Sequence, residues 1–151
     1  MFTNITWLFF DVGSTLIDEQ IAYKHRMEDI AEAANTTYQK VYDTAMEFYK
    51  QNKKGDLETT NQLGVPLPKW HTEDEILYPD AAQCLKTLSQ KYKIGIIANQ
   101  ELGTKERLQQ HGILQYIDLV IASAEEGVAK PDEKIFKIDW EERPVKVTTQ
   151  L

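Results

Sequence analysis

Three apolar segments of the chain are each followed by a polar side chain or a polar loop. The segments are residues 5–10, 94–98 and 117–122. The polar groups after them are the carboxylate of Asp11, the amide of Asn99 and the ammonium of Lys130. In an open parallel sheet the carboxyl ends of the strands meet at one edge, where ligands bind, so we expect these three groups to converge there. Each residue alone is more often a turn former, a cap or a solvated side chain, but the combination indicates a site.

The segments between these strands have helical spacing of their apolar residues. Residues 18–52 carry two such patterns, and residues 79–92 and 103–110 carry one each. Residues 55–68 are polar and interrupted by glycine and proline, which favours a loop. Strands that alternate with helices predict an α/β fold with a Rossmann-like parallel sheet. We expect a core formed by residues 1–17 and 72–151, with residues 18–71 as a small helical cap inserted after the first strand.

Local patterns at the helix ends and at the cysteine lead to further expectations. Thr36 with Gln39, and Thr72 with Glu75, have the spacing of capping boxes. The single Cys84 lies in an apolar helical pattern, which favours a small core residue.

The histidines of the chain do not form a metal-binding motif. His25, His71 and His111 lie in separate predicted elements, without metal-ligand spacing, and surface or capping roles are expected. The acidic residues that follow Trp70 and His71 are explained by a helix N-terminus.

Composition limits the classes of partner. The chain has 151 residues, 42% of them hydrophobic, which is enough for one domain with a core. Its net charge of −7 disfavours nucleic acid and acidic membrane surfaces as partners. The sequence shows no signal peptide and no apolar run of membrane-spanning length. Together with a single cysteine, this predicts a cytoplasmic protein.

Three motifs of the sequence resemble those of the haloacid dehalogenase (HAD) superfamily of hydrolases, most of whose members are phosphatases. The resemblance covers residues 5–138, and its motifs are "FFDVGSTL", "YPDAAQCLKTLSQKYKIGIIANQ" and "GVAKPDEKIF". The first looks like a buried strand that ends in an aspartate nucleophile. The second resembles the helix and strand that lead to a phosphate-binding position, and the third is similar to the lysine-containing segment of the family.

The resemblance implies a phosphatase that acts on a small phosphorylated metabolite. Asp11 would attack phosphorus and form an aspartyl-phosphate, which water then hydrolyses. Lys130 would offset negative charge, and Mg²⁺ would bind through Asp11 and the backbone of Gly13. The expected contacts to the substrate are made by Ser14, Thr15, Ala98 and Asn99.

Two positions depart from the family pattern. Phosphatases of this family normally have a second aspartate two residues after the nucleophile, where it serves as the general acid and base, but this chain has Gly13. The second motif usually supplies Ser or Thr, but this chain has Ala98 followed by Asn99. Activity is therefore expected to be weak, and a catalytically silent binding or interaction module on the same fold is the alternative. A small residue at position 13 is also found in relatives that break carbon–phosphorus bonds with a cap lysine, but the spacing of the lysines here selects none.

The C-terminal part of the chain also departs from the pattern. After Ile138 the sequence ends in "DWEERPVKVTTQL", without the acidic loop that completes the family's Mg²⁺ site, so that site is expected to be incomplete. Asp139, Glu141 and Glu142 are expected to belong to a solvated tail, and the chain to be truncated relative to the family. The first strand would then form an edge of the sheet, through which a homodimer could assemble.

Overall fold

The computed structural model describes residues 4–100 and 103–142, with side chains described up to Lys137. Contacts within the chain divide it into two compact units. Unit 1 comprises Met1–Asp18 and Ile76–Leu151, and unit 2 comprises Glu19–Glu75. Among the described residues, every helix is too short or too polar to cross a membrane.

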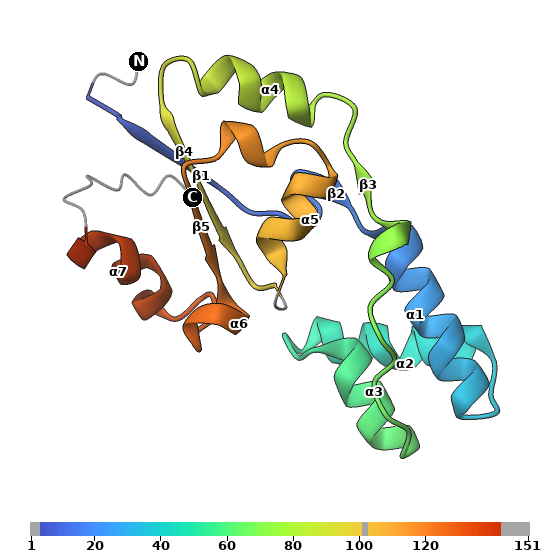
Figure 1. Cartoon of the computed structure of the whole chain (residues 1–151). Coiled ribbons are helices and arrows are strands. Elements are labelled where there is room, and N and C mark those ends of the chain that lie inside the picture. The colour runs from blue at the N-terminus through green and yellow to red at the C-terminus, as the bar shows by residue number, and fades with distance from the viewer. Residues whose placement is uncertain (1–3, 101–102, 143–151) are drawn as a thin grey trace. The chain divides into compact units, whose positions relative to one another are not determined.

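The centre of unit 1 is a parallel sheet. Its strands are β1 (Trp7–Phe10), β4 (Lys93–Ala98) and β5 (Leu119–Ala122), in the order β1-β4-β5 (Figure 1). Both neighbouring pairs are parallel, with Phe10 beside Ile96 and Ala98 beside Ala122. The predicted α/β fold with a parallel sheet is therefore confirmed, and β1 lies at one end of the sheet that the structure describes.

Alternation along β4 separates two apolar layers. Ile94, Ile96 and Ala98 join the cluster that includes Leu85 of α4 (Ala81–Leu88) and Leu108 of α5 (Thr104–Gln110). Ile97 points into a second cluster, which contains Ile121 of β5 and Ile135 of α7 (Glu133–Glu142). Successive side chains of a strand face opposite sides, so helices on both faces bury β4 completely except at its first residue.

Strand β1 is less buried than its composition predicts. All four of its residues are only partly buried, whereas a buried strand was expected. The physical reason is that β1 has a strand partner on one side only within the described sheet. Trp7 stacks on Phe9 with ring centroids 5.7 Å apart, which covers part of this apolar surface.

Gly95 allows β1 and β4 to pack closely. It lies beside Phe9 in the parallel register, and a Cβ atom built at Gly95 would lie 2.3 Å from the Phe9 ring. The absent side chain at position 95 is therefore the space that the phenyl ring fills.

Unit 2 is built from three helices within the described residues, α1 (Gln20–Ala33), α2 (Tyr38–Lys50) and α3 (Gly55–Leu63). Its apolar core consists of Met27, Ile30, Ala31, Val41 and Ala45. Helix α3 occupies part of the polar segment for which a loop was expected, so that expectation was wrong. The helix buries Thr59 and Thr60, whose hydroxyls donate to the carbonyls of Gly55 and Leu57 at 2.7 Å. With their hydroxyls bonded internally, the two threonines pack as small apolar residues would.

Short elements complete the two units. A two-stranded antiparallel sheet pairs β2 (Ile17–Asp18) with β3 (Ile76–Leu77). The others are the 3₁₀ turns η1 (Thr72–Asp74) and η2 (Leu114–Tyr116) and the short helix α6 (Ser123–Glu126). Helix α7 extends to Glu142, beyond the point where the tail was expected to begin, and residues 143–151 of that tail lie outside the described residues.

Three local predictions were wrong. The N-cap of α2 is Thr37, whose side chain accepts a hydrogen bond from the Lys40 amide at 3.3 Å, and not Thr36. Thr72 begins a 3₁₀ turn that leads into β3, so it does not cap the helix that follows. Cys84 is exposed, because the apolar face of the short helix α4 is formed by Ala81 and Leu85.

Candidate active site

The carboxylate of Asp11 lies at the carboxyl end of β1 and pairs with Lys130. The Lys130 ammonium lies 3.0 Å from Asp11 Oδ1, and the Val12 amide donates to the same oxygen at 2.8 Å. Neither contact uses Oδ2. Because 46% of the Asp11 side chain is exposed, this ion pair contributes little to stability. It orients the carboxylate instead, with one oxygen held and the other available to a ligand.

Asn99 holds the backbone of Lys130. Its side-chain amide donates to the Lys130 carbonyl at 3.0 Å, and its amide oxygen accepts from the Lys130 N–H at 2.7 Å. Asn99 follows β4, whereas Lys130 comes from the loop beyond β5, so this double contact joins two strand ends. The expected convergence of Asp11, Asn99 and Lys130 at one edge of the sheet is confirmed.

The turn after Asp11 is stabilised by its own backbone. The amides of Leu16 and Ile17 donate to the Val12 carbonyl at 2.9 and 3.1 Å, and the Ser14 amide donates to the Ile17 carbonyl at 2.8 Å. Ser14 has a positive φ of 58°, a conformation uncommon for a residue with a side chain. These bonds form a tight turn over residues 12–17, directly after Asp11.

The other predicted site residues differ in what they can offer a ligand. Ser14 and Thr15 are exposed beside Asp11, but their amides are already bonded within the turn. Ala98 is completely buried and can contribute only backbone. Gly13 is partly buried and has no side chain, so it offers a carbonyl and an amide but no acid.

The residues around Asp11 fit Mg²⁺ only in part. Mg²⁺ prefers an octahedron of oxygen ligands and commonly takes one or two carboxylates together with waters and phosphate oxygens. The Asp11 carboxylate and the Gly13 carbonyl oxygen are suitable ligands. Within residues 4–100 and 103–137, however, the one cluster of three potential ligand residues is His25, Asp29 and His71, and it does not include Asp11. That the Mg²⁺ site is incomplete stays a prediction.

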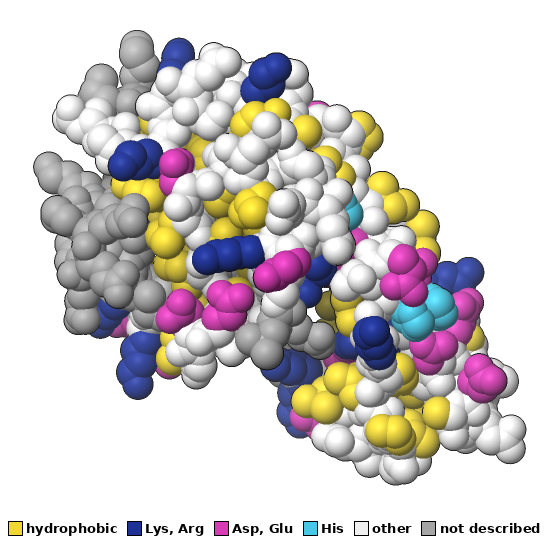
Figure 2. Space-filling model, viewed as in Figure 1, with side chains coloured by type: hydrophobic (Ala, Val, Ile, Leu, Met, Phe, Trp, Pro, Cys, Tyr) yellow, Lys and Arg dark blue, Asp and Glu magenta, His cyan; other side chains and the backbone are white. Residues whose placement is uncertain are grey.

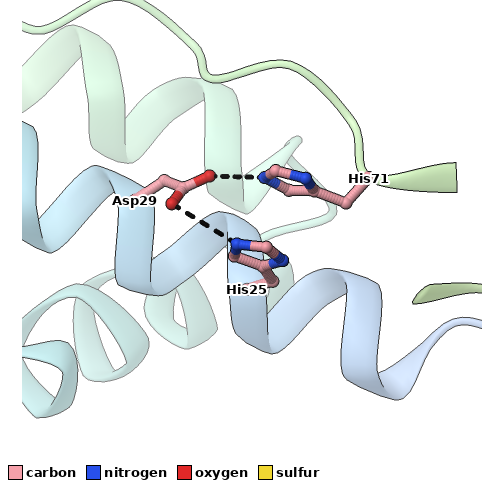
Figure 3. Close-up of side chains that lie close together, drawn as sticks. All are labelled: His25, Asp29 and His71. Atoms are coloured by element: carbon pink, nitrogen blue, oxygen red, sulfur yellow. Dashed lines mark hydrogen bonds and ion pairs between the residues drawn. The ribbon is translucent and has the colours of Figure 1, made fainter. Parts of the chain in front are cut away.

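The histidine cluster in unit 2 was not predicted from the sequence. His25 and His71 were expected in separate places, but their rings stack with centroids 3.5 Å apart and planes 4° from parallel. Both imidazoles face Asp29 (Figure 3). Hydrogen bonds with Asp29 and Glu73 raise the pKa of His71 above its ordinary value. The detectable signal was the spacing of His25 and Asp29, four residues apart on one helical face.

Comparisons with known proteins agree with this fold. The family model described as a haloacid dehalogenase-like hydrolase matches residues 5–138. Over 59 residues the chain is 42% identical to pyrimidine 5'-nucleotidase YjjG from Escherichia coli (strain K12); the match covers 38% of this chain and 26% of that protein. The chain therefore spans about a quarter of this curated relative in the match.

Solved structures match a larger share of the chain. A HAD-hydrolase from Bacillus subtilis, YfnB, which was solved bound to magnesium, has a TM-score of 0.68 at 19% identity, over 96% of this chain and 75% of that chain. A HAD phosphatase from Thermococcus onnurineus has a TM-score of 0.64 at 19% identity, over 89% of this chain and 69% of that chain. At this identity the likeness concerns the fold.

Proposed function

Because the chain belongs to the haloacid dehalogenase-like hydrolase family, we propose that it is a Mg²⁺-dependent phosphatase that acts through Asp11 on a small phosphorylated metabolite. The observation that carries this proposal is that the two carboxylate oxygens of Asp11 have different contacts. Lys130 and the Val12 amide both contact Oδ1, which leaves Oδ2 to act as the nucleophile.

The proposed reaction has two displacements at phosphorus. In the first, Asp11 Oδ2 forms a bond to phosphorus while the ester P–O bond breaks, and the departing alkoxide takes a proton from solvent. In the second, water attacks phosphorus, the acyl-phosphate bond breaks and inorganic phosphate leaves with Asp11 restored. Lys130 offsets the negative charge that would otherwise repel the phosphate from Asp11. When bound, Mg²⁺ supplies further positive charge for the phosphoryl oxygens.

The nature of residue 13 limits the rate of this chemistry. General acid and base catalysis contributes about two to four orders of magnitude, and Gly13 cannot supply a proton. Turnover should therefore be slow for alkyl phosphates, whose leaving groups need protonation, and faster for aryl phosphates. Since unit 2 is inserted directly after the first motif, we propose that it serves as the cap that selects the substrate, and that the protein works in the cytoplasm.

The test is hydrolysis of p-nitrophenyl phosphate and of pyrimidine nucleoside 5'-monophosphates, with and without Mg²⁺. The nucleotides are included because of the matching segment in the nucleotidase relative. We expect Mg²⁺-dependent turnover that Asp11→Asn abolishes, while Asp80→Asn, an exposed aspartate in unit 1, retains it. Wild-type turnover no higher than that of Asp11→Asn would refute the phosphatase. It would favour the catalytically silent binding module, an alternative that rests on the lack of an acid at Gly13.

A further inference from the structure

Two histidines and an aspartate of unit 2 form a compact polar cluster at the protein surface. His25 and Asp29 come from α1, and His71 precedes η1, 42 positions after Asp29. One ligand atom from each of the three lies within 4.8 Å of the others. The side chains of His25, Asp29 and His71 are 40%, 31% and 23% exposed, so an ion can reach the cluster from solvent.

Each of the two histidines presents its Nε2 atom to Asp29. The Nε2 atom of His71 lies 2.6 Å from Asp29 Oδ2, and the Nε2 atom of His25 lies 3.7 Å from Asp29 Oδ1. Figure 3 shows the two imidazoles on one side of the Asp29 carboxylate. Two nitrogens and a carboxylate are thereby directed toward one small volume.

The opposite ring nitrogens are held by other carboxylates. His25 Nδ1 lies 2.6 Å from Asp74 Oδ2, and His71 Nδ1 lies 2.9 Å from Glu73 Oε1. A carboxylate that accepts the Nδ1 proton fixes the tautomer and leaves the Nε2 lone pair for a metal, which is the usual outer arrangement around metal-bound histidine. In the metal-free protein the 2.6 Å contact of His71 Nε2 with Asp29 is a hydrogen bond, so a metal that binds there takes the place of a proton.

The local charge also favours a cation. Asp29, Glu73 and Asp74 supply three carboxylates to two imidazoles. The neighbouring cations on α1 have their own partners, since Lys24 pairs with Glu28 at 3.7 Å and Arg26 with Asp56 at 2.8 Å.

We propose that His25, Asp29 and His71 form a binding site for a divalent transition metal, of which Zn²⁺ is the reference ion. Imidazole nitrogen with a carboxylate suits Zn²⁺, Co²⁺ and Ni²⁺ better than Mg²⁺ or Ca²⁺. Zn²⁺ with ligands at 2.0–2.2 Å holds neighbouring ligand atoms about 3.4 Å apart. The three ligand atoms already lie within 4.8 Å of one another, so each pair has to change its separation by less than about 1.5 Å. Three protein ligands leave a coordination position for water.

The bound metal would cross-link unit 2 near both of its ends. The chain enters the unit at Glu19, just before α1, and leaves it at Glu75, just after η1. The metal joins these two segments through side chains, so it should stabilise unit 2 without taking part in the chemistry at Asp11.

The experiment titrates the metal-free full chain with Co²⁺, followed by its visible absorption, and with Zn²⁺ in competition with a chromogenic chelator. Excess Mg²⁺ is present throughout to occupy oxygen sites. We expect one equivalent to bind, and affinity to fall by more than about tenfold in His25→Ala and in His71→Ala. The matched control is His111→Ala, which removes the remaining histidine from unit 1 and should bind as the wild type does.

A second measurement uses the wild type alone and so does not depend on the folding of any variant. Nitrogen-detected NMR of the imidazoles should show the Nε2 resonances of His25 and His71, and not those of His111, shifting as Zn²⁺ is added. Absence of Zn²⁺ binding, equal loss of binding in His111→Ala, or Zn²⁺ shifts confined to His111 would overturn the proposal. Because Asp11 is untouched, these outcomes are independent of whether the protein hydrolyses phosphate esters.

Discussion

The side chain of Asn99 pairs with both backbone groups of Lys130, at 3.0 and 2.7 Å, and so fixes the residue whose ammonium contacts Asp11. The amide thus acts at one remove from the proposed chemistry, by holding the loop after β5 against the end of β4. A residue that the sequence marks as a substrate ligand has both of its polar ends engaged by the protein itself.

Replacing Asn99 should uncouple Lys130 from Asp11. We expect Asn99→Ala to reduce kcat/KM for an aryl phosphate by about 10- to 100-fold, since positioning of a charged group is a large part of such catalysis. Asn99→Asp retains the acceptor for the Lys130 N–H and should recover part of the loss. Equal activity of Asn99→Ala and wild type would show that the clamp does not position Lys130.

Adding an acid at position 13 should increase activity. Gly13 does not have the positive φ of the left-handed glycines, so its backbone accepts a side chain. We expect Gly13→Asp to raise kcat for alkyl phosphates by about a hundredfold or more, with a smaller gain for p-nitrophenyl phosphate, whose leaving group needs no proton. Gly13→Asn, which has the same size but no acid, is the control. A gain of equal size for both substrate types would indicate that the added residue works in some other way.

Part of this arrangement could be predicted from the sequence, because the carboxyl ends of parallel strands all lie at the same edge of the sheet. Asp11, Asn99 and Lys130 follow apolar segments, and that alone places them together. The pairing of Asn99 with the Lys130 backbone could not be predicted, because it depends on the path of a loop with no pattern of its own.

The missed features share a different cause. Helix α3 is polar in sequence and is buried through Thr59 and Thr60, whose internal hydrogen bonds are invisible to an apolar pattern. The pairing of His25 with His71 arises from the packing of η1 on α1, a tertiary contact between segments far apart in the chain. Helical spacing could have placed Asp29 beside His25, but not His71 beside both.

Gly95 should not tolerate a side chain. Gly95→Ala places a methyl group within 2.3 Å of the Phe9 ring, and we expect it to lower the free energy of unfolding of unit 1 by about 1–3 kcal/mol. Chemical denaturation measures this change. Combining it with Phe9→Leu, which replaces the phenyl ring with a smaller side chain, should recover part of the lost stability. A double variant no more stable than Gly95→Ala would show that the strain lies elsewhere.

Two tyrosines of unit 2 should make its stability fall at high pH. Burial, followed by the charges of Glu19 and Asp56, raises the pKa of Tyr23 to about 12, and burial is the main cause that raises the pKa of Tyr49. The unfolded state loses these protons near pH 10, while the folded state keeps them. The two protonated tyrosines therefore contribute fully to the free energy of unfolding below pH 10, and this contribution is lost as the pH rises toward 12.

Urea unfolding followed between pH 9 and pH 11 tests this dependence. We expect Tyr49→Phe to weaken the fall in stability relative to wild type, because the variant has no phenol at that position to ionise. Tyr42→Phe, at an exposed position of α2, is the matched control. A fall that is unchanged in Tyr49→Phe, or weakened equally in Tyr42→Phe, would contradict the assignment.

The free side of β1 predicts self-association. Within the described sheet β1 pairs only with β4, and its residues Trp7, Leu8, Phe9 and Phe10 are apolar and only partly buried. An apolar edge strand without proline or inward charge is a template for pairing with another chain, and two copies related by a two-fold axis could pair through it.

We therefore expect a dimer in equilibrium with monomer, so that the average mass measured by light scattering rises with protein concentration. Trp7→Lys introduces a charge on this strand and should shift the protein toward monomer, whereas Ile76→Lys, at an exposed position of β3, should not. A wild-type protein that stays monomeric at high concentration, with the β1 amides strongly protected from hydrogen exchange, would show that another part of the chain covers this edge.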